Sequence, residues 1–546
     1  MRLSARAGRT AAVLLGLWAV TVAFNFTKAV HIDDRAYLDI ARHIARHPLH
    51  PMSGRLNLFG IDEPLHETNQ PPLLFYVYAG VIRCLGESEP ALHAVMALFS
   101  LVAIVAFHAL ARRLAPKRAV LLTAMFCLGP AFLPGQNLMT DVPVMALWLV
   151  FFTLLIPPEA GGLTVRRAAL AAVIASAACL IKYVSLVLIP ILLVALLLRR
   201  RRRAAWVVLI PVGVLAAWSA CNVMEYGTAH LLSRPTTKLF ASSLAVSCEE
   251  WLIGLGAVCP FSVAALPFLR RSRRARMMIA ACALASCLSL AWGVLRMPEP
   301  IWYSLLRAAF VGSGALVCCA TASCLVDALR PLADGEPPEA RRDLAVVALW
   351  LVGAAAFVIL LAPFMAVRHL LLAIPAILLV LGRYVLGEVR RGWRVSAVLG
   401  TVALGLLLAA SDWRFADCYR ASAPRIARRY AGDRTVWFVG HWGWQWYAEK
   451  AGMEPYYQSE SILKPGDVLV VPSLVPRYGI MNDLPERLVK VEEVVVRPTP
   501  ATLVRTMATW PRWSGYYAYH SGGLPWIVSR MPLEKFVVYV VREGGD

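Results

Sequence analysis

The chain has 546 residues, of which 59% are hydrophobic and 16% are charged, against about 25% charged in an ordinary soluble domain. This composition excludes a soluble multidomain protein and indicates a protein embedded in a membrane. The net charge of +21 would suit a nucleic-acid-binding protein, but most arginines form short clusters between apolar runs. Such clusters are typical of cytoplasmic membrane loops, so we expect no nucleic-acid partner.

Apolar runs long enough to cross about 30 Å of hydrocarbon recur through the first 410 residues. Residues 11–24 lack a small-residue cleavage site, so we expect a retained first span rather than a signal peptide. The positive-inside rule then predicts an α-helical polytopic protein of the inner (plasma) membrane, with about 13 transmembrane helices and a cytoplasmic N-terminus. Every basic cluster falls inside in this topology: Arg112–Arg113, Lys117–Arg118, Arg199–Arg203, Arg270–Arg276 and Arg390–Arg391. Residues 1–410 are predicted to form this transmembrane domain.

The first span leads into a long outside loop, about residues 31–89, which opens with His-Ile-Asp-Asp-Arg-Ala-Tyr. Asp33 and Asp34 stand side by side at the membrane exit, where two carboxylates are costly unless they are solvated, paired or used. The apolar spacing from Tyr37 to Ile44 predicts a juxtamembrane helix that begins at the acidic pair. The pair could equally serve to cap this helix, because an Asp at an N-terminus bonds free N–H groups.

A second polar segment in the same loop, His66 to Gln70, runs directly into Pro71-Pro72 and an aromatic helix. Two prolines at a helix start fix the backbone, and their missing N–H groups are not needed there. On these residues alone, the segment could be only a rigid turn back into the membrane.

Residues 411–546 differ in character from the rest of the chain. Short β-branched and aromatic runs are separated there by Gly, Pro and charged turns: Thr435–Val439, Val468–Val471, Val491–Val496 and Phe536–Val541. The pattern predicts a small C-terminal α/β domain outside the membrane. The twelve cysteines show no CxxC and no zinc-ligand spacing, so neither a redox motif nor a structural metal is predicted.

Taken in order, the motifs of the first 410 residues resemble the C-type glycosyltransferases, which use polyprenyl-phosphate-linked sugars. The similar group is family 39, the protein O-mannosyltransferases and aminoarabinose transferases. Like that group, the chain has an acidic pair with Tyr37 nearby and a Pro-Pro-aromatic helix in its first outside loop. Later segments that resemble the family follow in the same order: Leu138–Pro143, Ile181–Pro190 and Arg368–Pro375. Two departures are Asp33-Asp34, where the family usually has Asp-Glu, and Asn69-Gln70, where aminoarabinose transferases have Glu-Lys.

The resemblance implies an inverting transfer of a sugar from a polyprenyl-phosphate donor to an envelope acceptor, which could be a lipid, a glycan or a protein. Asp33 would be the catalytic base, and Asp34 would support it. The candidates for binding the donor phosphate are Lys182, His230, Arg234, Lys238 and Arg368. The candidates for binding other parts of the substrates are Tyr37, Gln70 and Asp141.

This chemistry requires no cofactor, because a sugar on a phosphate already has a good leaving group. His66, Glu67 and His230 could hold a divalent metal, although scattered His and Glu residues often just face water. The aromatic segments 440–447 and 516–520 could stack on sugar rings, or could form a core or an interfacial belt.

The rival interpretations are a polytopic transporter or a flippase for lipid-linked sugars, and a non-catalytic scaffold. Transporters usually place ionisable residues inside spans near the midplane and often show internal repeats. Here the polar residues gather at the predicted outside ends of spans, which favours chemistry on a lipid head group.

Overall fold

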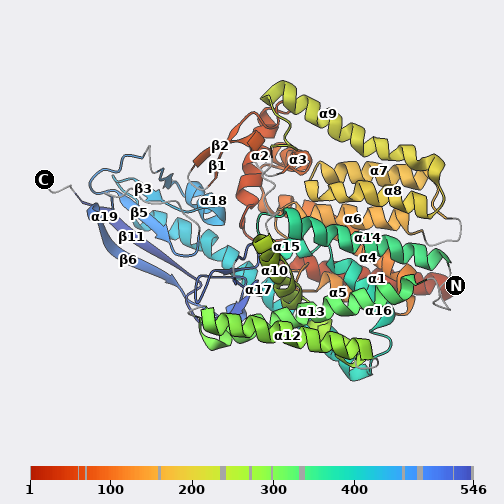
Figure 1. Cartoon of the computed structure of the whole chain (residues 1–546). Helices are drawn as coiled ribbons and strands as arrows, with labels where there is room; N and C mark the ends of the chain where they lie inside the picture. The colour runs from red at the N-terminus through yellow and green to blue at the C-terminus, as the bar shows by residue number, and fades with distance from the viewer. Residues whose placement is uncertain are drawn as a thin grey trace.

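A computed structural model of the whole chain shows a helical bundle joined to a smaller unit that contains a β-sheet (Figure 1). It describes residues 2–58, 61–67, 70–157, 162–233, 241–269, 273–296, 299–330, 338–457, 461–475, 484–520 and 522–542. The bundle holds α1 to α16, and the long helix α17 leads from it into the smaller unit, which we call the C-terminal unit.

The long apolar helices of the bundle match the hydrophobic runs of the sequence. Six helices in the described residues are long and apolar enough to cross a membrane, or seven if one pair bent by 84° is counted as a span. These helices are α4 (Glu89–Leu114), α9 (Leu209–Tyr226, extended by η4, Arg202–Val208), α12 (Arg273–Arg296), α13 (Ile301–Leu329), α14 (Pro338–Leu361) and α17 (Arg391–Arg429). The bent pair consists of α10 (Ala241–Val258) with η5 (Pro260–Ala264) and α11 (Ala265–Leu269).

Shorter helices fill the rest of the bundle. They are α1 (Arg2–Ala23), α5 (Ala119–Cys127, after η2, Pro116–Arg118), α6 (Asp141–Leu155), α7 (Val165–Cys179), α8 (Leu188–Leu198, after η3, Tyr183–Val187), α15 (Val367–Leu370) and α16 (Ile374–Tyr384). The expected span over 119–135 is helical only as far as Cys127, because Gly129 and Pro130 follow at once and do not continue a helix. The count of thirteen spans therefore stays a prediction.

The segment between α1 and α4 has the juxtamembrane helices that the sequence predicted. They are α2 (Asp34–Arg46) and α3 (Leu73–Leu85), with the hairpin β1 (Arg55–Leu58) and β2 (Ile61–Pro64) and the turn η1 (Leu65–Glu67) between them. Tyr37, Ile40 and Ile44 are buried along one face of α2, as their spacing requires. Pro72 precedes the first residue of α3, which fixes where this helix starts.

The C-terminal unit is built on a five-stranded sheet of order β4-β3-β5-β11-β6. Its strands are β3 (Val436–Phe438), β4 (Glu454–Pro455), β5 (Val468–Pro472), β6 (Leu488–Val496) and β11 (Glu534–Val541), with helices α18 (Trp442–Lys450) and α19 (Leu484–Arg487) and the turn η6 (Pro500–Thr502). Two small ladders pair β7 (Val504–Arg505) with β10 (Ile527–Val528), and β8 (Met507–Ala508) with β9 (Ser514–Gly515). β3 runs parallel to β4 and β5, whereas β11 is antiparallel to β5 and β6.

The C-terminal unit is joined tightly to the bundle. The predicted boundary at residues 410/411 falls inside α17, which continues without a break to Arg429 and is about 58 Å long at 1.5 Å per residue. The Tyr516 hydroxyl donates to the carbonyl of Ala131 at 2.8 Å, and the Trp526 indole donates to the carbonyl of Ala257 at 2.8 Å. Tyr516 and Trp526 therefore pack on the bundle.

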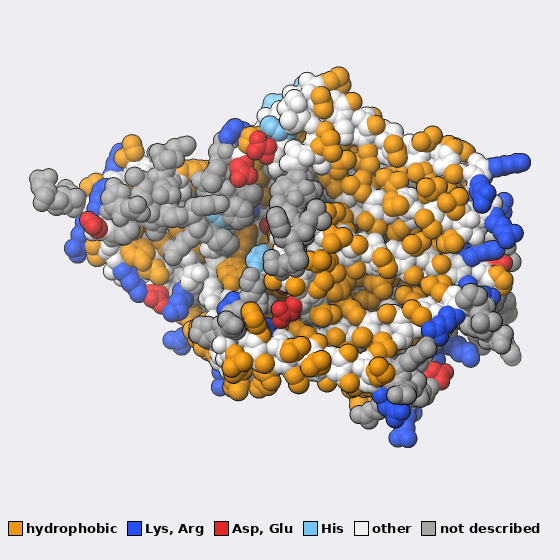
Figure 2. Space-filling model, in the orientation of Figure 1, with side chains coloured by type: hydrophobic (Ala, Val, Ile, Leu, Met, Phe, Trp, Pro, Cys, Tyr) orange, Lys and Arg blue, Asp and Glu red, His pale blue; other side chains and the backbone are white. Residues whose placement is uncertain are grey.

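Charge is distributed unevenly along the molecule. Figure 2 shows a broad apolar surface over the bundle helices, with Lys and Arg side chains gathered at the end of the bundle near the N-terminus. The C-terminal unit lies at the opposite end (Figure 1). This is the pattern that the positive-inside rule gives for a membrane protein with a basic cytoplasmic end.

Candidate functional site

A cavity of about 810 Å³ lies where the bundle meets the C-terminal unit. The start of α2, the start of α6, the residue before η3 and helix α15 contribute charged side chains to it. The end of α14 contributes Phe357, Val358 and Leu361, and the C-terminal unit contributes Trp442 and Trp513. The cavity thus has a charged end, formed by Asp33, Asp141, Lys182 and Arg368, and extensive apolar walls.

Asp33 faces this cavity and is held by an arginine. It occupies the N-cap position of α2, but its side chain makes no capping hydrogen bond. Arg368 Nη1 instead donates to Asp33 Oδ2 at 2.9 Å. Burial alone would lower the pKa of Arg368, but the carboxylates of Asp33 and Asp141 outweigh it and raise that pKa. Helix capping therefore does not account for Asp33.

Asp34 has a different environment, although it is the next residue. Its side chain is fully buried and does not line the cavity. Asp34 Oδ2 accepts a hydrogen bond from the His31 backbone N–H at 3.0 Å. Burial raises the pKa of Asp34 well above its usual value, which favours the neutral acid. The structure thus separates the predicted pair into one carboxylate at the cavity and one buried carboxyl group.

A second carboxylate and cation pair completes the charged end. Asp141 is the first residue of α6, and Lys182 precedes η3. Lys182 Nζ lies 2.6 Å from Asp141 Oδ1, and both side chains line the cavity. Two cations and two carboxylates therefore share one cavity, which gives it groups for binding an anion and for accepting a proton.

The two remaining predicted substrate residues also line the cavity. Tyr37 lies one turn along α2 from Asp33, and its ring stacks on Phe75 with centroids 5.1 Å apart. Gln70 precedes the prolines that start α3. The structure therefore gathers Asp33, Tyr37 and Gln70 with the charged residues, from five separate parts of the chain.

The other candidates lie elsewhere. His230 is buried behind the cavity wall, where its Nδ1 is 2.8 Å from the Tyr183 hydroxyl. Arg234 and Lys238 lie outside the described residues. His66 stacks on Tyr226, with centroids 5.2 Å apart. In the described part of the chain, no three His, Cys, Asp or Glu residues are placed to hold a metal ion, so His66, Glu67 and His230 do not form the metal site that the sequence allowed.

A family model supports the likeness that these residues suggest. Residues 69–223 match the model described as dolichyl-phosphate-mannose-protein mannosyltransferase, which covers less than half of the chain but includes Gln70, Asp141 and Lys182. The resemblance to the C-type, polyprenyl-phosphate-dependent glycosyltransferases is thereby confirmed. Together with its long apolar helices, this similarity indicates a multi-pass membrane protein.

Solved structures of glycosyltransferases are similar to the chain over most of its length. ArnT from Cupriavidus metallidurans in the apo state matches with 15% identity and a TM-score of 0.39, over 86% of this chain and 93% of ArnT. ArnT bound to undecaprenyl phosphate matches with 15% identity and a TM-score of 0.41, over 87% and 96%.

The oligosaccharyltransferase AglB from Archaeoglobus fulgidus, in complex with an inhibitory peptide and a dolichol-phosphate, matches with 13% identity and a TM-score of 0.46. That match covers 81% of this chain and 64% of AglB. At such identities and scores these similarities do not define an activity for this chain. A search of curated protein sequences finds no match.

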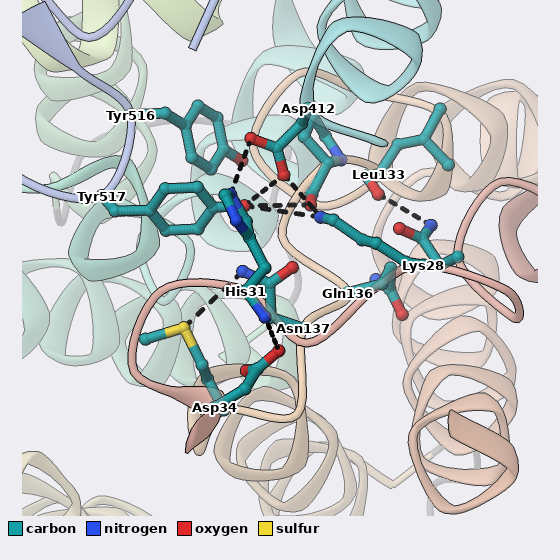
Figure 3. Close-up of polar contacts among 12 residues, drawn as sticks. Lys28, His31, Asp34, Leu133, Gln136, Asn137, Asp412, Tyr516 and Tyr517 are labelled. Atoms are coloured by element: carbon teal, nitrogen blue, oxygen red, sulfur yellow. Dashed lines mark hydrogen bonds and ion pairs between the residues drawn. The ribbon is translucent and has the colours of Figure 1, made fainter. Parts of the chain in front are cut away.

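One feature of this glycosyltransferase-like site was not predicted from the sequence. Figure 3 shows a buried polar cluster, made by Lys28, His31, Asp412 and Tyr517, in and beside the loop that leads into Asp33. Lys28 Nζ and the Tyr517 hydroxyl each donate to Asp412 Oδ2 at 2.5 Å, and His31 Nε2 lies 3.5 Å from Asp412 Oδ1. The cluster joins the loop before Asp33 to α17 and to Tyr517, which also lines the cavity.

Sequence reasoning missed this cluster because its partners are far apart in the chain. Lys28 and Asp412 are separated by 384 positions, so no local pattern links them. The available signal was weak: each is an ionisable residue at the end of an apolar run, where a partner is expected.

Proposed function

We propose that this chain is an inverting glycosyltransferase that moves a sugar from a polyprenyl-phosphate donor to an envelope acceptor. The observation that carries the proposal is the meeting of two carboxylate and cation pairs, Asp33–Arg368 and Asp141–Lys182, in one cavity. Beside these pairs, the cavity wall from α14 presents Phe357, Val358 and Leu361, which suit a lipid chain. A lipid phosphate needs both kinds of surface, with cations for its head group and an apolar wall for its tail.

The cations have a defined task in this reaction. When the acceptor oxygen bonds to the anomeric carbon, the bond from that carbon to the phosphate oxygen breaks, and negative charge builds up on the departing polyprenyl phosphate. Lys182 and Arg368 can carry this charge, because both line the cavity and the guanidinium group offers paired donors to a phosphate. The leaving group needs no proton, since a phosphate monoester anion is stable in water at neutral pH.

Asp33 is the base in this proposal. The acceptor hydroxyl must lose its proton as its oxygen attacks, and Asp33 is the carboxylate of the predicted pair that faces the cavity. Its present partner is Arg368. A donor phosphate that binds Arg368 would compete for this arginine and leave Asp33 available to the acceptor. Inversion follows from this single displacement, because attack and departure take place on opposite faces of the sugar.

The proposed location is the inner (plasma) membrane, with the N-terminus in the cytoplasm and the C-terminal unit outside. The gathering of Lys and Arg at the end opposite the C-terminal unit supports this orientation (Figure 2). The cavity lies at the junction with the C-terminal unit rather than midway along the bundle (Figure 1), a position that favours surface transfer over transport.

The direct test is binding of undecaprenyl phosphate to the purified full-length protein in nanodiscs, measured by native mass spectrometry. The double variant Lys182→Gln with Arg368→Gln should weaken binding about 10²- to 10⁴-fold, because hydrogen bonds to charged groups contribute about 1.5–3 kcal/mol each. Arg166→Gln is the matched control, since Arg166 is an exposed arginine at the start of α7. Unchanged affinity in the double variant would disprove the lipid-phosphate site.

Loss of folding must be separated from loss of the phosphate site. Removing Lys182 alone leaves Asp141 buried without its closest cation, which is destabilising in itself. The pair variant Asp141→Asn with Lys182→Gln keeps both side chains polar and removes both charges. If Lys182 binds the phosphate, the protein with this pair of substitutions should remain folded but bind undecaprenyl phosphate more weakly than the wild type does.

A further inference from the structure

The C-terminal unit lines the cavity with four rings and with the apolar side chains of Met507 and Ala518. This aromatic wall consists of Trp442, Trp513, Tyr517 and His520. The Trp442 and Trp513 ring centroids are 6.4 Å apart with 49° between the ring planes. The Trp513 indole N–H donates to the Ala518 carbonyl at 3.3 Å, which holds that ring in place. Among the described residues that line the cavity, the C-terminal unit contributes no Lys, Arg, Asp or Glu.

Trp442 is held in an unfavourable backbone conformation. Its φ is +61°, in the left-handed region that bulky side chains rarely adopt. Ile32, the residue before Asp33, also has a positive φ, of +50°, although it is β-branched. Both residues line the cavity. Backbone strain of this kind persists only where the surrounding structure enforces it, and it concentrates at binding and catalytic sites.

Close packing between α18 and the residues that lead into Asp33 enforces the positive φ angles of Trp442 and Ile32. Gly443 lies so close to Val30 that a Cβ on the glycine would be 2.1 Å from the Val30 carbonyl oxygen. The Val30 N–H donates to the Tyr447 hydroxyl at 2.9 Å, and this hydroxyl in turn donates to Glu89 at 2.7 Å. These contacts fix the first turn of α18 against the residues that lead into Asp33.

A second set of contacts fixes the rest of α18 to α2. The Arg35 guanidinium lies 2.9 Å from the Glu449 carboxylate, and the Arg42 guanidinium lies 4.3 Å from the centroid of the Trp446 ring. Both arginines belong to α2, the helix that begins directly after Asp33. The position of Trp442 relative to Asp33 is therefore set by rigid helices on both sides rather than by a loose loop.

We propose that Trp442 is a sugar-binding residue whose ring takes the apolar C–H face of a pyranose, with Trp513 beside it. This inference rests on the proposed function and adds the part of the site that recognises the sugar. A pyranose has an apolar face of C–H bonds, which packs on the electron-rich face of an aromatic ring. An aromatic wall without charged side chains suits this face, whereas the charged end of the cavity suits a phosphate. The ring bound could be the sugar of the donor or a sugar of the acceptor.

The test is saturation-transfer NMR on the full-length protein in nanodiscs, with methyl α-mannoside, methyl β-glucoside and methyl β-arabinopyranoside as probes. Trp442→Gly removes the ring, and because glycine adopts positive φ freely, this variant should keep the local backbone. Trp442→Phe retains an aromatic face. Trp206→Ala removes an exposed tryptophan on η4, remote from the cavity lining, and serves as the control. We expect Trp442→Gly to weaken binding of at least one glycoside about three- to tenfold, with Trp442→Phe intermediate.

Competition identifies the source of the sugar. If the glycoside signal is displaced by undecaprenyl-phosphate-mannose or undecaprenyl-phosphate-aminoarabinose but not by undecaprenyl phosphate, Trp442 holds the donor sugar. If the signal persists with all three lipids bound, Trp442 holds a sugar of the acceptor. Either result supports the proposal.

Equal glycoside binding by the wild type and Trp442→Gly would overturn the proposal, and so would an absence of glycoside binding by the wild type. If undecaprenyl phosphate still binds in that case, only the sugar-binding role of Trp442 fails. If undecaprenyl phosphate does not bind either, the proposed function itself fails.

Discussion

The charged end of the cavity and its aromatic wall are assembled in different ways. The charged end comes from residues at the ends of bundle helices, and each of its four members stands in a short local motif. The aromatic wall comes from the C-terminal unit and reaches the same cavity only because α17 and α18 bring it there. The charged end thus comes from short local motifs, whereas the aromatic wall depends on long-range packing.

Neutralising the base should give the largest effect and is the strongest test of the charged end. Asp33→Asn keeps the size of the side chain and could still cap a helix. If Asp33 accepts the acceptor proton, turnover should fall about 10²- to 10⁴-fold with little change in donor affinity. Turnover is measured as release of polyprenyl phosphate from a lipid-linked sugar, in membranes that supply the acceptor. Near-normal turnover would remove Asp33 from the mechanism and leave the charged end with a binding role only.

Asp33 could be singled out from the sequence because a carboxylate at a membrane exit is costly, whereas Asp141, Lys182 and Arg368 were named through the resemblance to the glycosyltransferase family. Asp33, Asp141, Lys182 and Arg368 are ionisable residues at the ends of apolar runs, and such residues are kept when they are paired or functional. The pairing itself could not be read from the sequence. Asp33 meets Arg368 across 335 positions, and only the fold shows that Asp33 rather than Asp34 faces the cavity.

The sequence also located the helix α2 and four strands of the C-terminal unit, because apolar periodicity and β-branched runs are local signals. It also named the aromatic segments 440–447 and 516–520, which hold Trp442, Tyr517 and His520, but it left open whether they stack on sugars or form a core, and it did not name Trp513. The expected division at residue 410 lies inside α17. A helix that leaves the membrane and continues through polar residues shows no change of period where it exits.

The dependence of the aromatic wall on long-range packing can be tested at Gly443. Gly443→Ala places a methyl group 2.1 Å from the Val30 carbonyl oxygen, so α18 must move away from the residues that lead into Asp33. We expect a loss of about 1–3 kcal/mol in stability, as for other overpacked sites, together with weaker binding of any sugar that Trp442 contacts. Thermal unfolding in detergent and the glycoside NMR measurement check both effects.

Gly80→Ala is the matched control for this substitution. Gly80 lies inside α3, and a Cβ there would meet no atom within 4 Å. Alanine has the higher helix propensity, so this variant should be as stable as the wild type or slightly more stable. If Gly443→Ala behaved like Gly80→Ala, the aromatic wall would not depend on the contact with Val30.

The smallest effect is expected for Asp34→Asn, and it is a change in how stability depends on pH. The direction of this change distinguishes Asp34 from Asp33. Burial raises the pKa of Asp34 in the folded protein above the value of about 3.9 that an unfolded chain has. The folded state therefore holds this proton more tightly than the unfolded state does. The stability that the proton contributes is complete below about pH 4 and is lost as pH rises toward the folded pKa. Asp34→Asn cannot lose this contribution, because the amide stays neutral, and its oxygen can still accept from the His31 N–H.

The difference in stability between Asp34→Asn and the wild type should therefore increase with pH. We expect similar melting temperatures at about pH 4 and a melting temperature about 1–3 °C higher for the variant at pH 8. Asp33→Asn, measured alongside, should lose turnover, whereas Asp34→Asn should keep most of its turnover. A wild type that is increasingly more stable than Asp34→Asn as pH rises would show that Asp34 is a buried carboxylate. In that case Asp33 and Asp34 would both be charged carboxylates, rather than one base and one neutral carboxylic acid that supports it.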